Sequence, residues 1–369
     1  MQESTAAVLA PWLDREEPGV DHPREQLCWQ FAQQARACDA FGSALYPELL
    51  AKGIEDLQAE GVTWRLTRDH IAPGRGKAIA LRVMAAVHRL VLTGRARSLE
   101  PWYAASSGTA DPTTCWPTFH EVLEEQEAVL AELVKLGCQT NETGRAASLI
   151  LGYLHVAETT RLPMAVIEVG AAAGLNLRWD RFHVSGGGAS FGDPSSPVDL
   201  TDFWVDPGEV PDVEVEVIAR TAVDRQPLDP TSHEGRLALT SSVWGDQAGR
   251  LARLDGAIQL AREIPVITVQ ADAVEWVEAN LATSPGTVTV LVQSVLREYL
   301  AQEANDRLDA AVAAVGAQAT TEAPLAWIQL EPTSVKRRHG LTVTTWPGGA
   351  PRRYTTAGSL GADVRRIES

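Results

Sequence analysis

The sequence predicts an α/β protein in which a parallel sheet follows an N-terminal helical lobe. Up to about residue 160, apolar residues recur at helical spacing, and from Leu162 onward short apolar runs alternate with helical segments. This alternation is typical of parallel sheets, because a parallel strand pair needs a long crossover connection. A third observation, a small-residue turn directly after the first apolar run, indicates where such a sheet would bind a ligand.

The N-terminal lobe is expected to be all-helical and to span residues 1–160. Helices are predicted at about 29–41, 76–92, 116–136 and 143–157, and the segment 101–115, rich in turn-forming residues, is predicted to be a surface loop. No linker rich in Pro, Gly or Ser separates the lobe from the sheet. We therefore expect the lobe to cover the strand ends.

The second domain is expected to span residues 161–369 and to contain five parallel strands. A C-terminal antiparallel hairpin should follow, because two apolar segments flank the turn Pro347-Gly-Gly-Ala-Pro351. Residues 185–211, with several Gly, Pro and Asp, are predicted to be an insertion or loop. The expected strands are 164–169, 213–219, 265–270, 287–293 and 324–330, and the hairpin strands are 341–346 and 352–356.

Composition limits the function classes. The 369 residues are 45% hydrophobic and 22% charged, and the net charge of −16 disfavours nucleic acid or an anionic membrane as partner. No stretch approaches 18 apolar residues and the N-terminus lacks a signal-peptide pattern, so a cytoplasmic protein is expected. We expect four reduced, buried cysteines and no metal, because neither Cys-x-x-Cys pairs nor histidines at ligand spacing occur. The cysteines are Cys28, Cys38, Cys115 and Cys138.

The most informative segment runs from the end of the first strand, Glu168-Val-Gly170-Ala-Ala172-Ala-Gly174-Leu-Asn176. A buried strand that passes through a tight small-residue turn into a helix holds a nucleotide-type ligand in Rossmann-like folds. Glycine allows the backbone to turn sharply or to approach a ligand closely, since it has no Cβ. The alternative is that the turn only closes a strand–helix junction.

Acidic and polar residues follow the other predicted strands in order. Asp224 follows the second strand and is suited to a ribose diol, although Asp-x-x-Pro is also a common turn. Asp272 and Ala273 follow the third strand and could hold a purine edge, but Asp272 could also cap the next helix. Gln293 and Ser294 follow the fourth strand as substrate-facing groups, or Ser294 is a helix N-cap.

Two polar clusters lie outside the strand exits. Gln139-Thr-Asn141-Glu142-Thr-Gly-Arg145 holds more hydrogen-bonding side chains than a helix cap requires, so Asn141, Glu142 or Arg145 is expected to face a substrate. A simple cap is the alternative. In Trp244-Gly-Asp246-Gln247 the Trp could be packing, whereas Asp246 and Gln247 would suit a polar substrate.

In this order, these segments resemble the class I S-adenosylmethionine-dependent methyltransferases. Glu168-x-Gly170-x-x-x-Gly174 matches their first motif, Asp224-x-x-Pro227 their ribose site, and Asp272-Ala the adenine side. The resemblance implies a Rossmann-like methyltransferase sheet and S-adenosyl-L-methionine as cofactor. It departs from the family at Ala172, where glycine is usual, and in the long segment before the second strand. The implied cofactor-binding residues are Glu168, Gly170, Ala172, Gly174, Asn176, Asp224, Asp272 and Ala273.

A narrower resemblance covers most of the chain. Glu-Val-Gly-Ala-x-Ala-Gly-Leu-Asn with Asp180-Arg-Phe182, the upstream cluster ending at Arg145, and Trp244-x-Asp246-Gln247 look like a bacterial family of uncharacterised proteins, a domain of unknown function. That family name carries no activity.

The methyltransferase resemblance implies methyl transfer to a small polar molecule, mainly by positioning two reactants for in-line displacement. Glu298, Asp246 or Glu142 could act as base if the acceptor loses a proton. The alternative is a non-catalytic adenosyl-ligand-binding sensor or scaffold of the same fold. A nicotinamide-dependent oxidoreductase is disfavoured, since the turn lacks Gly-x-Gly-x-x-Gly. The expected catalytic residues are Gln293, Ser294, Glu298 and Asp246, and the expected substrate-binding residues are Asn141, Glu142, Arg145 and Gln247.

Overall fold

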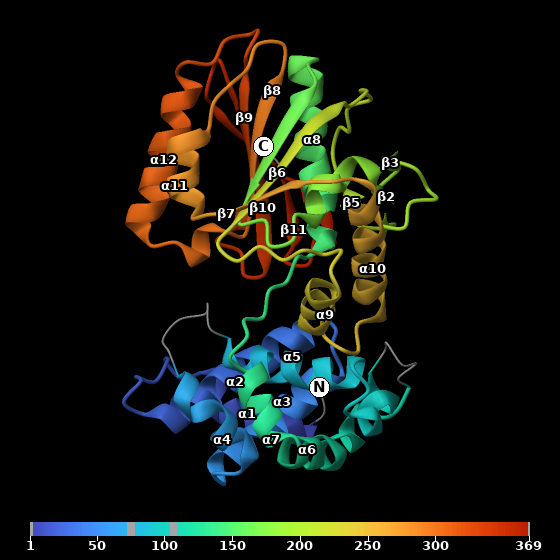
Figure 1. Ribbon diagram of the computed structural model, residues 1–369, viewed down its shortest axis with the longest axis vertical. Helices are drawn as coiled ribbons and strands as arrows, with labels where there is room; N and C mark the ends of the chain where they lie inside the picture. The colour runs from blue at the N-terminus through green and yellow to red at the C-terminus, as the bar shows by residue number, and fades with distance from the viewer. Residues whose placement is uncertain (1–2, 72–77, 104–108, 368–369) are drawn as a thin grey trace. The chain divides into compact units, whose positions relative to one another are not determined.

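The computed structural model describes residues 3–71, 78–103 and 109–367 (Figure 1). The chain forms two compact units. The first is Met1–Thr140 with Arg236–Leu251, and the second is Asn141–Gly235 with Ala252–Ser369. The sequence predicted one boundary at residue 160, whereas the chain passes from unit to unit after Thr140, Gly235 and Leu251. A single cut at residue 160 therefore does not separate the units.

The first unit is helical. Its core contains Phe31, Leu49, Val87 and Leu123, all buried. The predicted helix 116–136 is two helices that meet at Gln126, and residues 76–77 and 104–108 of the predicted segments lie outside the described residues. The helices that begin in this unit before residue 141 are α1 (Glu3–Leu13), α2 (Pro23–Ala40), α3 (Leu45–Gln58), α4 (Val62–Thr67), α5 (Ile79–Leu92), α6 (Trp116–Glu125) and α7 (Glu127–Leu133), with short 3₁₀ turns η1 (Arg68–His70), η3 (Arg97–Trp102) and η5 (Pro112–Thr114).

The second unit is mixed α/β and is built on a nine-stranded sheet in the order β5-β12-β11-β10-β9-β8-β1-β6-β7 (Figure 1). β10 and β11 pair antiparallel, which confirms the predicted hairpin. A small second sheet has the order β3-β2-β4. The strands are β1 (Met164–Val169), β2 (His183–Gly186), β3 (Ala189–Phe191), β4 (Asp199–Leu200), β5 (Trp204–Asp206), β6 (Val217–Asp224), β7 (Ile267–Gln270), β8 (Val288–Ser294), β9 (Leu325–Pro332), β10 (Arg338–Trp346), β11 (Pro351–Gly358) and β12 (Val364–Arg366).

Five central strands run parallel: β1 pairs with both β6 and β8, β7 extends the sheet beyond β6, and β9 extends it beyond β8. Counted along the chain, these five strands lie in the spatial order 3-2-1-4-5, which doubly wound sheets share. The order reverses between β1 and β8. Ligands of open parallel sheets bind at this reversal, beyond the carboxyl ends of the strands.

Helices cover both faces of this sheet (Figure 1). α11 (Ala273–Asn280) and α12 (Gln302–Gly316) share a core with Val169, Leu291 and Trp327. α8 (Ala146–Thr160) packs on β9 and β10, where a Cβ at Gly152 would lie 3.0 Å from Ile328 Cγ2. Successive strand residues point to opposite faces of the sheet. Trp327 therefore marks the face covered by α11 and α12, and Ile328 marks the face covered by α8. The remaining helices are α9 (His233–Ser242) and α10 (Ala248–Glu263), with η6 (Thr143–Arg145), η7 (Leu175–Arg181) and η8 (Arg297–Tyr299).

The predicted second strand exists, but its predicted bounds, 213–219, lie four to five residues too early. The strand is β6, and it runs from Val217 to Asp224 because Met164 and Val169 of β1 pair with Val217 and Val223. The valine alternation before residue 217 lies outside the sheet. Asp224 is consequently the last residue of a strand and not part of the following loop. The predicted loop 185–211 also contains short strands, one of which, β5, pairs with β12 at the sheet edge.

The cysteines are free thiols; Cys28, Cys38 and Cys115 are buried, and Cys138 is half-buried. No helix within the described ranges is long and apolar enough to cross a membrane.

Candidate functional site

The loop after β1 is held entirely by the second unit. Gly170, Ala172 and Gly174 have φ of 70°, 53° and 62°, so Ala172 occupies a conformation that favours glycine. Each amide from Gly170 to Leu175 already donates a hydrogen bond. The acceptors are Val223 O for Gly170 and Ala171, Asp224 Oδ2 for Ala172, Asn141 Oδ1 for Ala173 and Leu175, and Ala171 O for Gly174.

Asp224 joins this loop to the neighbouring strand. Its Oδ2 accepts from Ala172 N at 2.8 Å, and its Oδ1 accepts from Gln226 N at 2.8 Å. The side chain is half-buried at the carboxyl end of β6. The turn-forming interpretation of Asp224 is therefore confirmed, and ribose binding stays a prediction, for which each carboxylate oxygen keeps a lone pair.

Asp272 is a helix cap, as the alternative interpretation predicted. Its Oδ1 accepts from Val274 N at 2.9 Å and Glu275 N at 3.2 Å at the start of α11. Its Oδ2 binds the Arg225 guanidinium, with Nε at 2.9 Å. Ala273 is buried as the first residue of that helix. Contact of this pair with a purine stays a prediction.

A second group of polar residues lies on the α8 face of the sheet. Glu168, Ser294 and His339 belong to this face, because Val169, Leu291 and Trp327 mark the opposite one and side chains alternate along each strand. Each carries a buried polar atom with no hydrogen-bond partner among the described residues. These atoms are Glu168 Oε2, Ser294 Oγ and His339 Nδ1, and Asn176 Oδ1 in η7 is likewise unpartnered.

Glu168 is only 4% exposed, and burial raises the pKa of its carboxyl group to about 8. The charge of Asp224 adds to this rise, whereas Arg145 and Arg178 oppose it. At pH 7 the group is therefore mainly a neutral acid that can donate a hydrogen bond.

The polar residues before α8, Asn141, Glu142 and Arg145, each contact a different part of the second unit. Asn141 caps the loop after β1 and not its own helix, whereas Glu142 Oε1 accepts from Gly144 N at 3.2 Å and caps η6. Asn176 Nδ2 donates to Glu142 O at 3.3 Å. Arg145 is partly buried, and its Nε donates to Ser359 O at 3.3 Å. The polar cluster and the turn are therefore brought together by direct hydrogen bonds.

The exit of β8 contains one residue held in structural hydrogen bonds, Gln293, and one strained residue, Val295. Gln293 is fully buried on the α11/α12 face, where Nε2 donates to Glu331 at 2.7 Å and Oε1 accepts from Trp327 Nε1 at 3.1 Å. Val295 has φ 57°, a strained value for a β-branched residue. The prediction that Ser294 could be an N-cap is wrong, since Leu296 precedes η8 and Ser294 Oγ is unpartnered. Glu298 is exposed.

Asp246 and Gln247 belong to the first unit and bind there. The Asp246 carboxylate accepts from Ser43 Oγ and from the amides of Ala44 and Leu45, at 2.9 to 3.0 Å, at the start of α3. Gln247 Nε2 donates to Phe41 O at 2.8 Å. Both side chains therefore hold the helical core together.

Trp244 of the same motif is buried, as the packing alternative predicted. Its ring centroid lies 6.2 Å from that of Phe41 and 6.0 Å from that of Tyr46.

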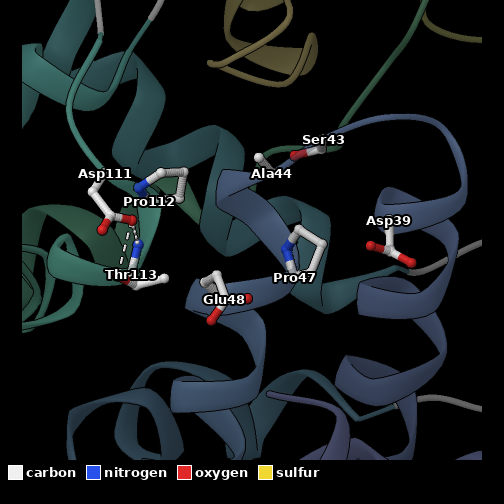
Figure 2. Close-up of a pocket in the computed structure, with 8 residues that line it drawn as sticks. All are labelled: Asp39, Ser43, Ala44, Pro47, Glu48, Asp111, Pro112 and Thr113. Carbon is white, nitrogen blue, oxygen red and sulfur yellow. Dashed lines mark hydrogen bonds between the residues drawn. The ribbon is translucent and has the colours of Figure 1, made fainter. Parts of the chain in front are cut away.

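The first unit also contains a cavity of about 290 Å³ (Figure 2). Asp39, Glu48 and Asp111 contribute carboxylates to its lining, and none of the predicted site residues lines it. Ser43 of the lining already donates to Asp246. Within the described parts of the chain, no group of three or more His, Cys, Asp or Glu could hold a metal ion.

Sequence reasoning did not select His339 or Glu331 as site residues. It selected residues that follow parallel strands and two polar clusters outside the sheet, and it selected none from the antiparallel hairpin. His339 belongs to the group on the α8 face, and Glu331 is bonded to Gln293 at the exit of β8. His339 lies near the start of an antiparallel strand and pairs with Pro332, so it reaches the same sheet edge from the other direction. The predicted hairpin was the signal that could have identified it.

A family model described as "Uncharacterized protein conserved in bacteria (DUF2332)" matches residues 29–366. This agrees with the narrower resemblance found in the sequence. Comparisons with the curated proteins and with the solved structures gave no match.

Proposed function

The chain belongs to this bacterial family, whose description names no activity, and we propose that its second unit transfers a methyl group from S-adenosyl-L-methionine to a small polar molecule. One observation carries the proposal. At the reversal of strand order, the glycine-containing loop of β1 lies against Asp224 of β6 and against the exit of β8, where a Cβ at Gly170 would lie 2.9 Å from Leu296 Cδ1.

The hydrogen bonds of the loop favour an adenosyl ligand over a dinucleotide. A Rossmann dinucleotide site binds pyrophosphate with free amides at a helix N-terminus. Here all six backbone amides from Gly170 to Leu175 donate hydrogen bonds to acceptors within the protein, so none is free for a phosphate. S-adenosyl-L-methionine has no phosphate, and its ribose diol needs an acceptor such as Asp224.

In this proposal, the residues of the second unit position the reactants. Asp224 accepts from the ribose hydroxyls, and the loop after Glu168 contacts the methionyl part. When bound, the cofactor would supply an electrophilic methyl group on its sulfonium, and the thioether left after transfer would be S-adenosylhomocysteine. An acceptor placed over Ser294 attacks in line with its lone pair. Glu298 takes any proton released, since Asp246 and Glu142 already cap helices.

We expect S-adenosylhomocysteine to raise the melting temperature of the full chain more than NAD does. A ligand that binds only the folded state stabilises it by mass action, by about 2.7 kcal/mol at one hundred times Kd. Differential scanning fluorimetry with both ligands at millimolar concentration measures this. A shift with NAD and none with the adenosyl compound would reject methyl transfer in favour of a dinucleotide enzyme.

Gly170→Val is expected to abolish the response to S-adenosylhomocysteine while circular dichroism still shows native helical content. The residue has φ 70°, which costs a branched side chain on the order of 1–3 kcal/mol, and its Cβ would press on Leu296. Gly188→Val is the matched control, because that glycine also has positive φ, at 82°, but its Cβ would meet nothing within 4 Å. Normal binding by Gly170→Val would show that the turn is only structural.

A non-catalytic adenosyl-binding protein is the second candidate function. In two of the four predicted catalytic residues, both polar side-chain atoms are already in structural hydrogen bonds: Nε2 and Oε1 of Gln293, and both carboxylate oxygens of Asp246. This favours a protein that binds the ligand without catalysis. Release of S-adenosylhomocysteine during incubation with the cofactor and a mixture of small acceptors distinguishes the two, since a sensor would bind without turnover.

A further inference from the structure

We propose that the methyl acceptor carries a carboxylate, which Arg145 binds at the α8 face of the sheet together with Ser294 and His339. The inference deepens the proposed function and rests on it for the role of the ligand as acceptor. The recognition site itself is argued from Arg145 and the unpartnered atoms around it.

The backbone fixes Arg145 in place. A Cβ at Gly144 would lie 2.2 Å from Leu360 O, and a Cβ at Gly361 would lie 2.0 Å from Gly144 O. η6 and the turn after β11 therefore touch through glycine backbone on both sides. Because Nε donates to Ser359 O, the orientation of the guanidinium is set before any ligand arrives.

The two terminal nitrogens of Arg145 have no hydrogen-bond partner among the described residues, and they form the fork that binds a carboxylate bidentately. Burial lowers the pKa of Arg145, with Glu142, Tyr299, Glu298 and Glu331 opposing that effect. Glu142 and Glu331 are already occupied: the first caps η6, and the second accepts from Gln293 and the amides of Leu296 and Arg297. The terminal nitrogens of Arg145 are thus left for a ligand.

Ser294 and His339 supply neutral hydrogen-bonding groups on the same face. Burial, and then the charge of Arg145, lower the pKa of His339 to about 4, so the imidazole is neutral at pH 7. Glu168 is mainly protonated there as well. Arg178 is committed to Ile264 O and Gly174 O. One cation beside these neutral groups, with the carboxylates of Glu142, Glu298 and Glu331 also near it, matches a monoanionic carboxylate better than a phosphate dianion.

The test compares ligand pairs that differ in charge but scarcely in shape. Isothermal titration of the full chain, with S-adenosylhomocysteine present, measures benzoate against benzamide, butyrate against butyramide, and inorganic phosphate. We expect each carboxylate to bind at least tenfold more tightly than its amide, and phosphate to bind more weakly. Arg145→Ala should remove this preference, and Arg145→Lys should reduce it because it keeps the charge but loses the fork.

Arg262→Ala, an exposed arginine of α10, is the control and should keep the preference. If Arg145→Ala does not fold, Ser294→Ala replaces it, with a three- to tenfold loss of carboxylate affinity expected.

Equal binding of acid and amide, or preference for phosphate, overturns the inference. Adenosyl binding without carboxylate discrimination would leave the proposed function standing and reject this inference alone. Preference for the carboxylate over the amide, without any binding of S-adenosylhomocysteine, would leave this inference standing and reject the proposed function.

Discussion

Replacing Glu168 by glutamine should make the protein more stable at high pH, by about 5 kcal/mol at pH 9. Burial raises the pKa of this carboxyl from its ordinary 4.5 to about 8, and about 1.4 kcal/mol per pH unit accumulates over that interval. The folded state binds the proton more tightly than the unfolded state. Stability therefore falls as pH rises from about 4.5 to about 8; below that window the group costs nothing, and above it the full penalty persists without further change. Glutamine removes the penalty because it cannot ionise.

The measurement is urea unfolding at pH 5 and pH 9, followed by hydrogen exchange of the β1 amides so that the second unit is observed directly. Glu158→Gln, an exposed glutamate on α8, serves as control and should change stability by less than about 0.5 kcal/mol. An equal stability difference between wild type and Glu168→Gln at both pH values would mean that Glu168 is ionised in the folded protein.

Asn141→Ala should destabilise the second unit by about 2–4 kcal/mol and weaken adenosyl binding at the same time. The amide oxygen of Asn141 accepts from Ala173 N and Leu175 N, and an unsatisfied buried donor costs about 1–3 kcal/mol. The sequence had suggested acceptor binding for Asn141, but its side chain is hydrogen-bonded to the loop after β1, which we propose contacts the cofactor. Ligand affinity and unfolding free energy should therefore fall together.

Asn141→Asp keeps the accepting oxygen and should retain most of the stability. Asn280→Ala, which removes an exposed amide bonded to Trp276 O in α11, should be nearly neutral. If Asn141→Ala instead lowered acceptor affinity with unchanged stability and adenosyl binding, the original assignment would hold.

Much of the fold was predictable because it depends on local pattern. Apolar runs of five to eight residues separated by helical periodicity identify buried parallel strands, so β1, β8 and β9 were located within two residues. The hairpin of β10 and β11 followed from its turn chemistry. The cap at Asp272 was also visible, since capping residues act within one helical turn.

Strand pairing could not be read in the same way. The alternating valines at 213 and 215 look as strand-like in isolation as the residues that follow them. β6 nevertheless begins at Val217, because the residues of β1 from Met164 to Val169 pair with Val217 to Val223. β5 and β12 are three residues each; β5 pairs with β12 at the sheet edge, and β12 also pairs with β11. Partners distant in sequence decide such elements.

The sequence by itself determined the loop from Gly170 to Gly174 and the polar residues that follow the strands, because backbone conformation and strand ends leave local signatures. Tertiary structure alone decided their roles. It made Asp246 a cap of α3, turned Asn141 toward Ala173 and Leu175, and added His339 to the face that carries Glu168 and Ser294. A polar side chain acquires its role from the partner that burial gives it, and those partners lie from 32 to more than 200 residues away.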